Sequence, residues 1–193
     1  METSPEVLAG LIQKVLEDLA GTEVSKAEGA NGLYPTVNEA VEAGLAAHKK
    51  LIGMSLQRRK DIIASIRNSV LNRNEELSAM AVEETHLGRY EDKVRENILC
   101  ATKTPGVEDI EPRALSGDNG LMLLEYAPVG MIGALTPITN PTGTLINNSI
   151  GMISAGNAVL FNAHPSARRT STFPSGPLAL STMKASEEYD GPR

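Results

Sequence analysis

The stretch from Leu121 to Ser166 constrains the fold of this chain more than any other part. Two apolar runs, Met131–Thr136 and Ala158–Phe161, lack polar alternation, as is typical of strands buried on both faces. The segment between them predicts a helix with one apolar face, formed by Leu145, Ile146, Ile150, Met152 and Ile153. Strand, helix and strand with short connections form a βαβ unit, so the sequence predicts a parallel sheet with a right-handed crossover.

The segment between the first of these strands and the helix is a turn that contains two prolines. Pro137 and Pro141 each fix their own backbone angle and disfavour a helical conformation in the residue before them. Thr142 is expected to cap the helix, and Gly156 is expected to end it, with Asn157 able to share that role.

Motifs along this stretch resemble the aldehyde dehydrogenase superfamily. They are Pro128-Val129-Gly130-Met131-Ile132-Gly133, Thr136-Pro137 through Asn140-Pro141, Ser154-Ala155-Gly156-Asn157-Ala158-Val159, and His164-Pro165-Ser166. The Thr-Pro-x-Thr-Asn-Pro-Thr form of the turn resembles the CoA-acylating branch, in particular the propionaldehyde and acetaldehyde dehydrogenases of bacterial microcompartments. The resemblance extends from about Leu33 to Thr170, and members of the family are far longer than this chain. It implies an α/β fold, namely an incomplete, N-terminal part of a Rossmann-type cofactor domain.

Residues 1–20 predict an amphipathic helix, and residues 21–36 predict a linker of small and polar residues. The apolar stripe of the helix consists of Val7, Leu8, Leu11, Ile12, Val15, Leu16 and Leu19. From this pattern alone, the helix packs on the main body or docks into a partner's groove. The resemblance favours docking, because microcompartment aldehyde dehydrogenases often carry such a helix, which directs them to a shell protein through residues equivalent to 5–20.

Residues 37–170 are expected to form the partial cofactor domain, beginning with four helices. The predicted helices are 37–52, a helix capped by Ser55, 75–85 ended by Gly88, and 91–102 with Val94, Ile98 and Leu99 facing inward. Turn-forming residues at 115–119 then predict a hairpin between Arg113–Leu115 and Leu121–Tyr126.

Residues 171–193 are rich in Ser, Pro and Gly and show no sustained apolar periodicity, so they are expected to be a disordered tail. The abrupt end of the resemblance suggests a shifted reading frame or a truncated gene. Because this tail offers no further crossover helix, the apolar side of Leu145–Ile153 and at least one sheet edge are expected to remain uncovered. A chain with such surfaces is predicted to be partly folded and prone to association.

Composition narrows the classes of partner. The net charge of −6 and the 3% of aromatic residues, with no Trp, argue against nucleic acid. The sequence contains no apolar run long enough to span a membrane and only one cysteine, as expected for a protein of the reducing cytoplasm. The resemblance adds the interior of a bacterial microcompartment as a location, and it leaves a homo-oligomer open.

Asn140 is the main candidate for chemistry. By resemblance, the matching asparagine donates its side-chain amide to the oxyanion that forms when a thiolate attacks an aldehyde, a role that suits a fixed neutral donor. The alternative is a turn asparagine that satisfies its own backbone.

A second group of residues is expected to bind NAD. Cofactors lie at the carboxyl ends of the strands in open α/β sheets. The resemblance places the nicotinamide beside the backbone of Thr136, Pro137 and Ile138, and it places the adenosine ribose near His164, Pro165 and Ser166. His164 stands where many relatives have lysine, and the alternative for it is a histidine of a surface turn.

The catalytic cysteine of the superfamily lies well downstream of this region. Cys100 does not match it and is expected to be structural. Two interpretations follow. The chain is a fragment of an NAD-dependent enzyme that converts an aldehyde and CoA to acyl-CoA and is itself inactive, or it is a non-catalytic module that docks to a shell or to full-length subunits.

Overall fold

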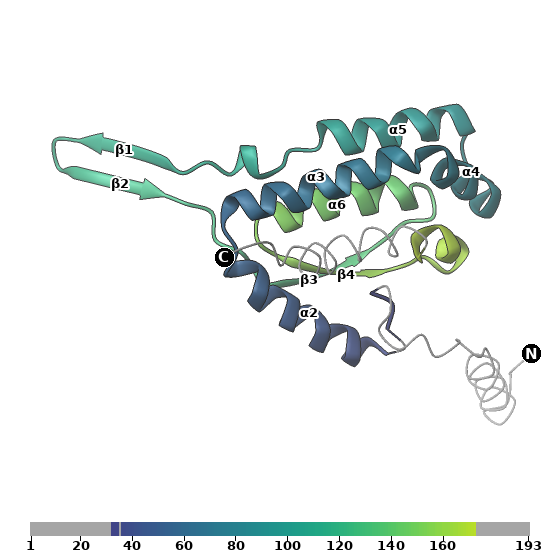
Figure 1. Ribbon diagram of the computed structural model, residues 1–193, viewed down its shortest axis with the longest axis horizontal. Coiled ribbons are helices and arrows are strands. Elements are labelled where there is room, and N and C mark those ends of the chain that lie inside the picture. The colour runs from purple at the N-terminus through teal and green to yellow at the C-terminus, as the bar shows by residue number, and fades with distance from the viewer. Residues whose placement is uncertain (1–31, 35, 173–193) are drawn as a thin grey trace, which may run out of the picture.

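The computed structural model describes residues 32–34 and 36–172, and the stripe of residues 5–20, most of the linker and residues 173–193 lie outside this part (Figure 1). Four helices come first: α2 (Val37–Ile52), α3 (Leu56–Asn72), α4 (Asn74–Thr85) and α5 (Tyr90–Lys103). After the short turn η1 (Val107–Asp109), the chain continues through β1 (Arg113–Gly117), β2 (Gly120–Leu124), β3 (Met131–Leu135), α6 (Pro141–Ser154), β4 (Ala158–Asn162) and η2 (Pro165–Ala167). The result is an α/β fold that is mostly helical, as expected.

The predicted βαβ unit is confirmed. Strands β3 and β4 pair in parallel from Met131 opposite Ala158 to Leu135 opposite Asn162, and α6 connects them. Gly156 follows α6 with a φ of +83°, a conformation that favours glycine, so its predicted role at the helix end is also confirmed. In Figure 1, α6, α3 and α5 lie over one face of this small sheet, and α2 lies under the other.

The apolar side of α6 is the centre of the core. Leu145, Ile146, Ile150 and Ile153 are at most 2% exposed and pack with Ile62, Ile66 and Val70 of α3 and with Ala101 and Val107. The expectation that this side of α6 would remain uncovered is therefore wrong. Among the described residues, helices α3 and α5, which precede the sheet in the sequence, cover it.

The inward face of α5 also differs from the prediction. Ile98 and Leu99 are 42% and 59% exposed, whereas Lys93, Asn97 and Ala101 are buried. The reason is a polar network between α4 and α5, in which Asn97 donates to Ser78, Ser78 donates to Asn74, and Asn74 donates to the carbonyl of Val94. Because buried polar groups need hydrogen-bond partners, this network fixes which face of α5 packs against the body.

Several helix ends follow the local sequence, but the end of α4 differs from the prediction. The side chains of Thr36 and Ser55 cap α2 and α3 by accepting bonds from Glu39 and Arg58 backbone N–H groups. Helix α4, however, ends at Thr85, and His86 rather than the predicted Gly88 takes the left-handed conformation directly after it, with a φ of 55°. Residues 168–172 are helical, and Glu84 of α4 accepts hydrogen bonds from the N–H groups of Arg169 and Thr170 at 2.7 and 2.6 Å.

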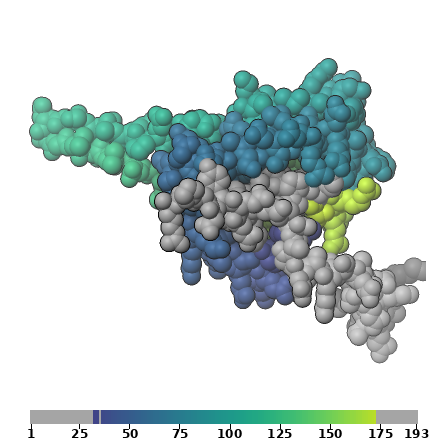
Figure 2. All heavy atoms as spheres, viewed as in Figure 1, coloured from purple at the N-terminus to yellow at the C-terminus, as the bar shows by residue number. Residues whose placement is uncertain are grey.

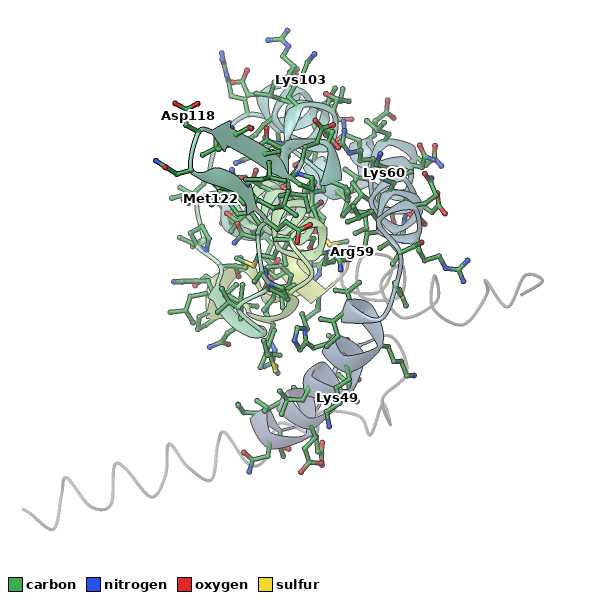
Figure 3. The ribbon with its side chains drawn as sticks, turned by 90° about the vertical axis from the view of Figure 1, so that its left-hand side faces the viewer. Lys49, Arg59, Lys60, Lys103, Asp118 and Met122 are labelled. Carbon is green, nitrogen blue, oxygen red and sulfur yellow. The ribbon has the colours of Figure 1, made fainter. Side chains whose placement is uncertain are left out.

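The predicted hairpin is confirmed and projects away from the body. Strands β1 and β2 pair antiparallel from Arg113 opposite Leu124 to Gly117 opposite Gly120, and every residue of both strands is exposed. Figure 2 shows this arm extending from the rest of the molecule, and Figure 3 shows Asp118 at its turn and Met122 on β2. Residues of α2 and β4 line much of an apolar pocket of about 310 Å³.

Candidate functional site

The carboxyl ends of the two parallel strands meet at one edge of the sheet. The turn 136–140 follows β3, and residues 163–166 follow β4. Both the backbone N–H and the hydroxyl of buried Thr136 donate to the carbonyl of Asn162, at 3.0 and 3.2 Å. The polar groups of Thr136 thus join the two strands, and Pro137 and Thr139 are left exposed at the edge.

Asn140, and not the predicted Thr142, caps α6. Its Oδ1 accepts a hydrogen bond of 3.2 Å from the N–H of Gly143, and Pro141 is the first helical residue. Proline suits that first position because its fixed φ is already helical, which places the cap one residue before it. Thr142 is instead buried inside the first turn.

The other end of the Asn140 amide is bound to α5. Its Nδ2 donates to Oε1 of Glu96 at 2.5 Å, and Oε2 of Glu96 accepts from the ammonium of Lys93 at 3.1 Å. Lys93, which is only 7% exposed, also donates to the carbonyl of Thr139 at 2.9 Å. We refer to Lys93, Glu96, Thr139 and Asn140 as the amide clamp, since together they fix both the turn and the amide within it.

Two glycines make room for the amide clamp. A Cβ at Gly143 would lie 2.6 Å from Nδ2 and 2.7 Å from Oδ1 of Asn140, too close for any side chain. A Cβ at Gly88 would lie 3.3 Å from Cε of Lys93, and Gly88 has a φ of +80° that favours glycine. Gly143 is therefore required for Asn140 to fold back over the helix end.

His164 lies half-buried after β4 and caps η2. Its Nδ1 accepts a hydrogen bond of 3.1 Å from the N–H of Ser166. Because Nδ1 is the acceptor, the neutral ring carries its proton on Nε2, which can donate to a ligand. Pro165 and Ser166 are exposed beside it.

Cys100 has the properties of a structural residue. It is half-buried on α5 and packs against the core. Burial raises the pKa of its thiol, the negative charge of Glu96 raises it further, and Lys93 opposes the shift. A thiol with a raised pKa is a poor nucleophile at neutral pH, since the thiolate is the reactive form.

The sequence singled out Asn140 as a candidate but not Lys93, Glu96 and Gly143, which contact it or make room for it. The signal for Lys93 was present, because Lys93, Asn97 and Ala101 recur at four-residue steps and mark one face of α5. The prediction chose the opposite face because Ile98 and Leu99 are apolar. The contacts of Glu96 and Gly143 with Asn140 join segments whose proximity no local pattern reveals.

Within the part of the chain that the structure describes, no group of three or more His, Cys, Asp or Glu side chains is arranged to hold a metal ion. A search of the same residues finds no helix with the length and hydropathy needed to cross a membrane.

Comparison with known proteins identifies what the chain is similar to. The sequence profile of the aldehyde dehydrogenase family matches residues 14–173. The acetaldehyde dehydrogenase (acetylating) of Bilophila wadsworthia is 42% identical over 172 aligned residues, covering 86% of this chain and 35% of that protein. The chain thus spans about a third of the length of such relatives.

Two solved structures are similar in both sequence and fold. The propionaldehyde dehydrogenase of Rhodopseudomonas palustris, solved with bound CoA and an acylated cysteine, is 44% identical with a TM-score of 0.78, covering 81% of this chain and 36% of that one. An engineered glycolyl-CoA reductase with bound NADP⁺ is also 44% identical with a TM-score of 0.78, with the same coverage.

Proposed function

Because the chain belongs to the aldehyde dehydrogenase family, we propose that it is part of a CoA-acylating aldehyde dehydrogenase that uses NAD. The reaction converts an aldehyde, CoA and NAD to acyl-CoA and NADH. The observation that carries this proposal is the amide of Asn140, which is held at the carboxyl edge of the parallel sheet by bonds at both its oxygen and its nitrogen. The names of the relatives support the CoA-acylating chemistry.

In this proposal, Asn140 stabilises the oxyanion that forms when a thiolate attacks the aldehyde carbonyl. One N–H of its Nδ2 binds Glu96, and the amide group has a second N–H to donate. A donor that is already fixed in place needs no reorganisation as the charge develops, and removing one such donor typically costs about 100- to 1,000-fold in rate.

The residues at the sheet edge fit a dinucleotide. Pro137 and half-buried Ile138 offer apolar surface, and Nε2 of His164 offers a donor for a ribose hydroxyl. The two segments 136–138 and 164–166 contain no carboxylate that would repel phosphates. When bound, the nicotinamide supplies the acceptor for a hydride. Residues 136–138 would border the nicotinamide, and 164–166 would border the adenosine ribose.

Cofactor titration tests this assignment. The affinity of the purified chain for NAD⁺, measured by calorimetry, is expected to fall about fivefold in His164→Ala. This is the effect of losing one hydrogen bond. Lys60→Ala, on the exposed side of α3, is the control and should leave the affinity unchanged. Titration with NADP⁺ distinguishes the two nicotinamide cofactors. Equal affinities of the wild-type and His164→Ala chains would exclude His164 from the site.

The 193-residue chain alone is proposed to be inactive, because Cys100 is its only cysteine and its thiol pKa is raised. Propionaldehyde, CoA and NAD⁺ are expected to give no NADH absorbance at 340 nm with the purified chain. Formation of NADH that disappears in Cys100→Ala would show that Cys100 is a nucleophile after all.

The apolar stripe of residues 5–20 supports a further part of the proposal, namely docking to a microcompartment shell protein within the cytoplasm. A soluble reporter fused to residues 1–21 is expected to co-localise with shell protein, and Leu11→Glu is expected to abolish this. Lys14→Glu changes a residue off the stripe and serves as the control. If Leu11→Glu localises as well as the original, the docking proposal is wrong.

A further inference from the structure

We propose that Glu96 and Lys93 are positioning residues for Asn140: Glu96 fixes the orientation of the amide, and Lys93 neutralises the charge of Glu96. This inference rests on the proposed role of Asn140 as an oxyanion donor. The three side chains come from two elements, α5 and the turn before α6, and the bonds between them are 2.5 and 3.1 Å long.

The orientation of Asn140 matters because the two ends of an amide have opposite hydrogen-bonding character. Oδ1 faces a donor, the N–H of Gly143, and Nδ2 faces an acceptor, the carboxylate of Glu96. Rotating the amide by half a turn would oppose oxygen to carboxylate and NH₂ to N–H, so both bonds select the same orientation. This orientation uses one N–H for Glu96, and the other has no partner among the described residues.

Glu96 alone would carry a cost for the proposed chemistry. A carboxylate bonded to the donor repels a negative charge that develops on the other side of the amide. Lys93 offsets this repulsion, because its ammonium binds Oε2 of the same carboxylate and its side chain is only 9% exposed. The bond from Lys93 to the carbonyl of Thr139 also places the positive charge directly beside the turn.

Nuclear magnetic resonance of the full ¹⁵N-labelled chain tests the proposal without cofactor or substrate. The side-chain NH₂ signals of Asn140 are assigned by their absence in Asn140→Ala. In Glu96→Ala, the two proton shifts of Asn140 are expected to converge toward those of an exposed asparagine, and its side-chain hydrogen exchange should accelerate about tenfold. Glu96→Gln keeps one acceptor oxygen, for which Asn140 and Lys93 then compete, so its pattern is expected to lie between those of the wild type and Glu96→Ala.

Lys93→Met separates charge from packing. Met keeps an apolar stem next to Gly88 but removes the ammonium. The charge of Glu96 is then uncompensated, and the proton that Asn140 donates to Glu96 is expected to shift downfield, opposite to its shift in Glu96→Ala. Asn147 on α6, whose Oδ1 accepts from Thr104, is the internal control and should keep its NH₂ signals in every variant. Unchanged backbone spectra show that the fold is intact.

Gly143→Ala gives a second route to the same result, since its methyl group would displace the amide while leaving α5 unaltered. It should reproduce the pattern of Glu96→Ala and tests the clamp even if a change in α5 prevents folding. Asn140 signals that stay unchanged in both Glu96→Ala and Gly143→Ala would overturn the proposal. The NADH assay and the cofactor titration do not enter this test, so its failure is distinguishable from failure of the proposed function.

Discussion

The two small sheets of the described chain each contain a continuously apolar strand but have opposite environments. Strands β3 and β4 lie between α6 on one face and α2 on the other, whereas nothing in the described chain covers β1 and β2 (Figures 1 and 2). Leu121–Leu124 is as continuously apolar as Met131–Leu135. The difference teaches that an apolar run specifies a strand, but the neighbouring elements decide whether that strand is buried.

The connections explain this difference. A parallel pair requires a crossover, and the crossover helix brings cover with it, whereas a hairpin closes through a two-residue turn and brings none. An isolated hairpin is only marginally stable in water. The exposed Leu121, Leu123 and Tyr126, at 74%, 60% and 69%, thus form an apolar surface of the kind that marks an interface. The homo-oligomer left open by the resemblance stays a prediction, and this apolar surface is where it can be tested.

The largest expected effect concerns α6. Ile150 is fully buried in the core, so Ile150→Ala should lower the free energy of unfolding by about 2–5 kcal/mol. Leu123→Ala in the arm is the matched control and should change it by less than about 0.5 kcal/mol. Urea denaturation followed by circular dichroism measures both. Equal losses in the two variants would show that the arm belongs to the same cooperative core.

Several elements of this comparison were predictable from the sequence. Period and turn chemistry predicted the βαβ unit, the hairpin and the Ser55 cap of α3, because each depends on residues close together in the chain. The cover on α6 was not predictable in this way, since α3 lies about 80 residues before it. The same holds for the amide clamp, in which Glu96 and Asn140 are 44 positions apart.

The second prediction concerns association through the arm. Replacing Leu121 and Leu123 together by Lys should weaken self-association at least tenfold. Association would either bury the lysine charges at an apolar contact, which costs free energy, or exclude them from it and lose the contact. Sedimentation velocity over a range of concentrations measures this effect. Lys substitution of Ile98 and Leu99, which are also exposed but lie on α5, provides the control. Association that persists in the arm variant but is lost in the α5 variant would place the interface on the body.

The third prediction concerns the effect of acid pH on the stability of the body, without the arm. Partial burial raises the pKa of Glu84, but hydrogen bonds from Thr170 and Arg169 outweigh it and lower the pKa below the ordinary 4.5. The stabilisation is therefore present above the ordinary pKa and is lost as the pH falls through the folded value. We expect Glu84→Gln to be less stable by about 1 kcal/mol at pH 7 and nearly equal to wild type at pH 3. Denaturation at both pH values measures this, and a difference independent of pH would contradict it.

The smallest expected effect is at the root of the arm. Glu108 in η1 accepts from the Gly106 N–H and pairs with Arg67 of α3 at 3.3 Å, but its side chain is 63% exposed. Glu108→Gln keeps an acceptor and removes the charge, so the loss of stability should be below about 0.5 kcal/mol, as for other exposed ion pairs. Arg67→Met is the contrasting variant. It should lower the stability by more than Glu108→Gln does, because Arg67 also donates to the carbonyl of Thr104 at 2.9 Å. Thermal denaturation measures the loss of stability in both variants, and comparing the two losses shows where the cooperative body ends and the arm begins. If Glu108→Gln costs as much as Arg67→Met, the ion pair itself anchors the arm, and the cooperative body extends past η1 to the start of β1.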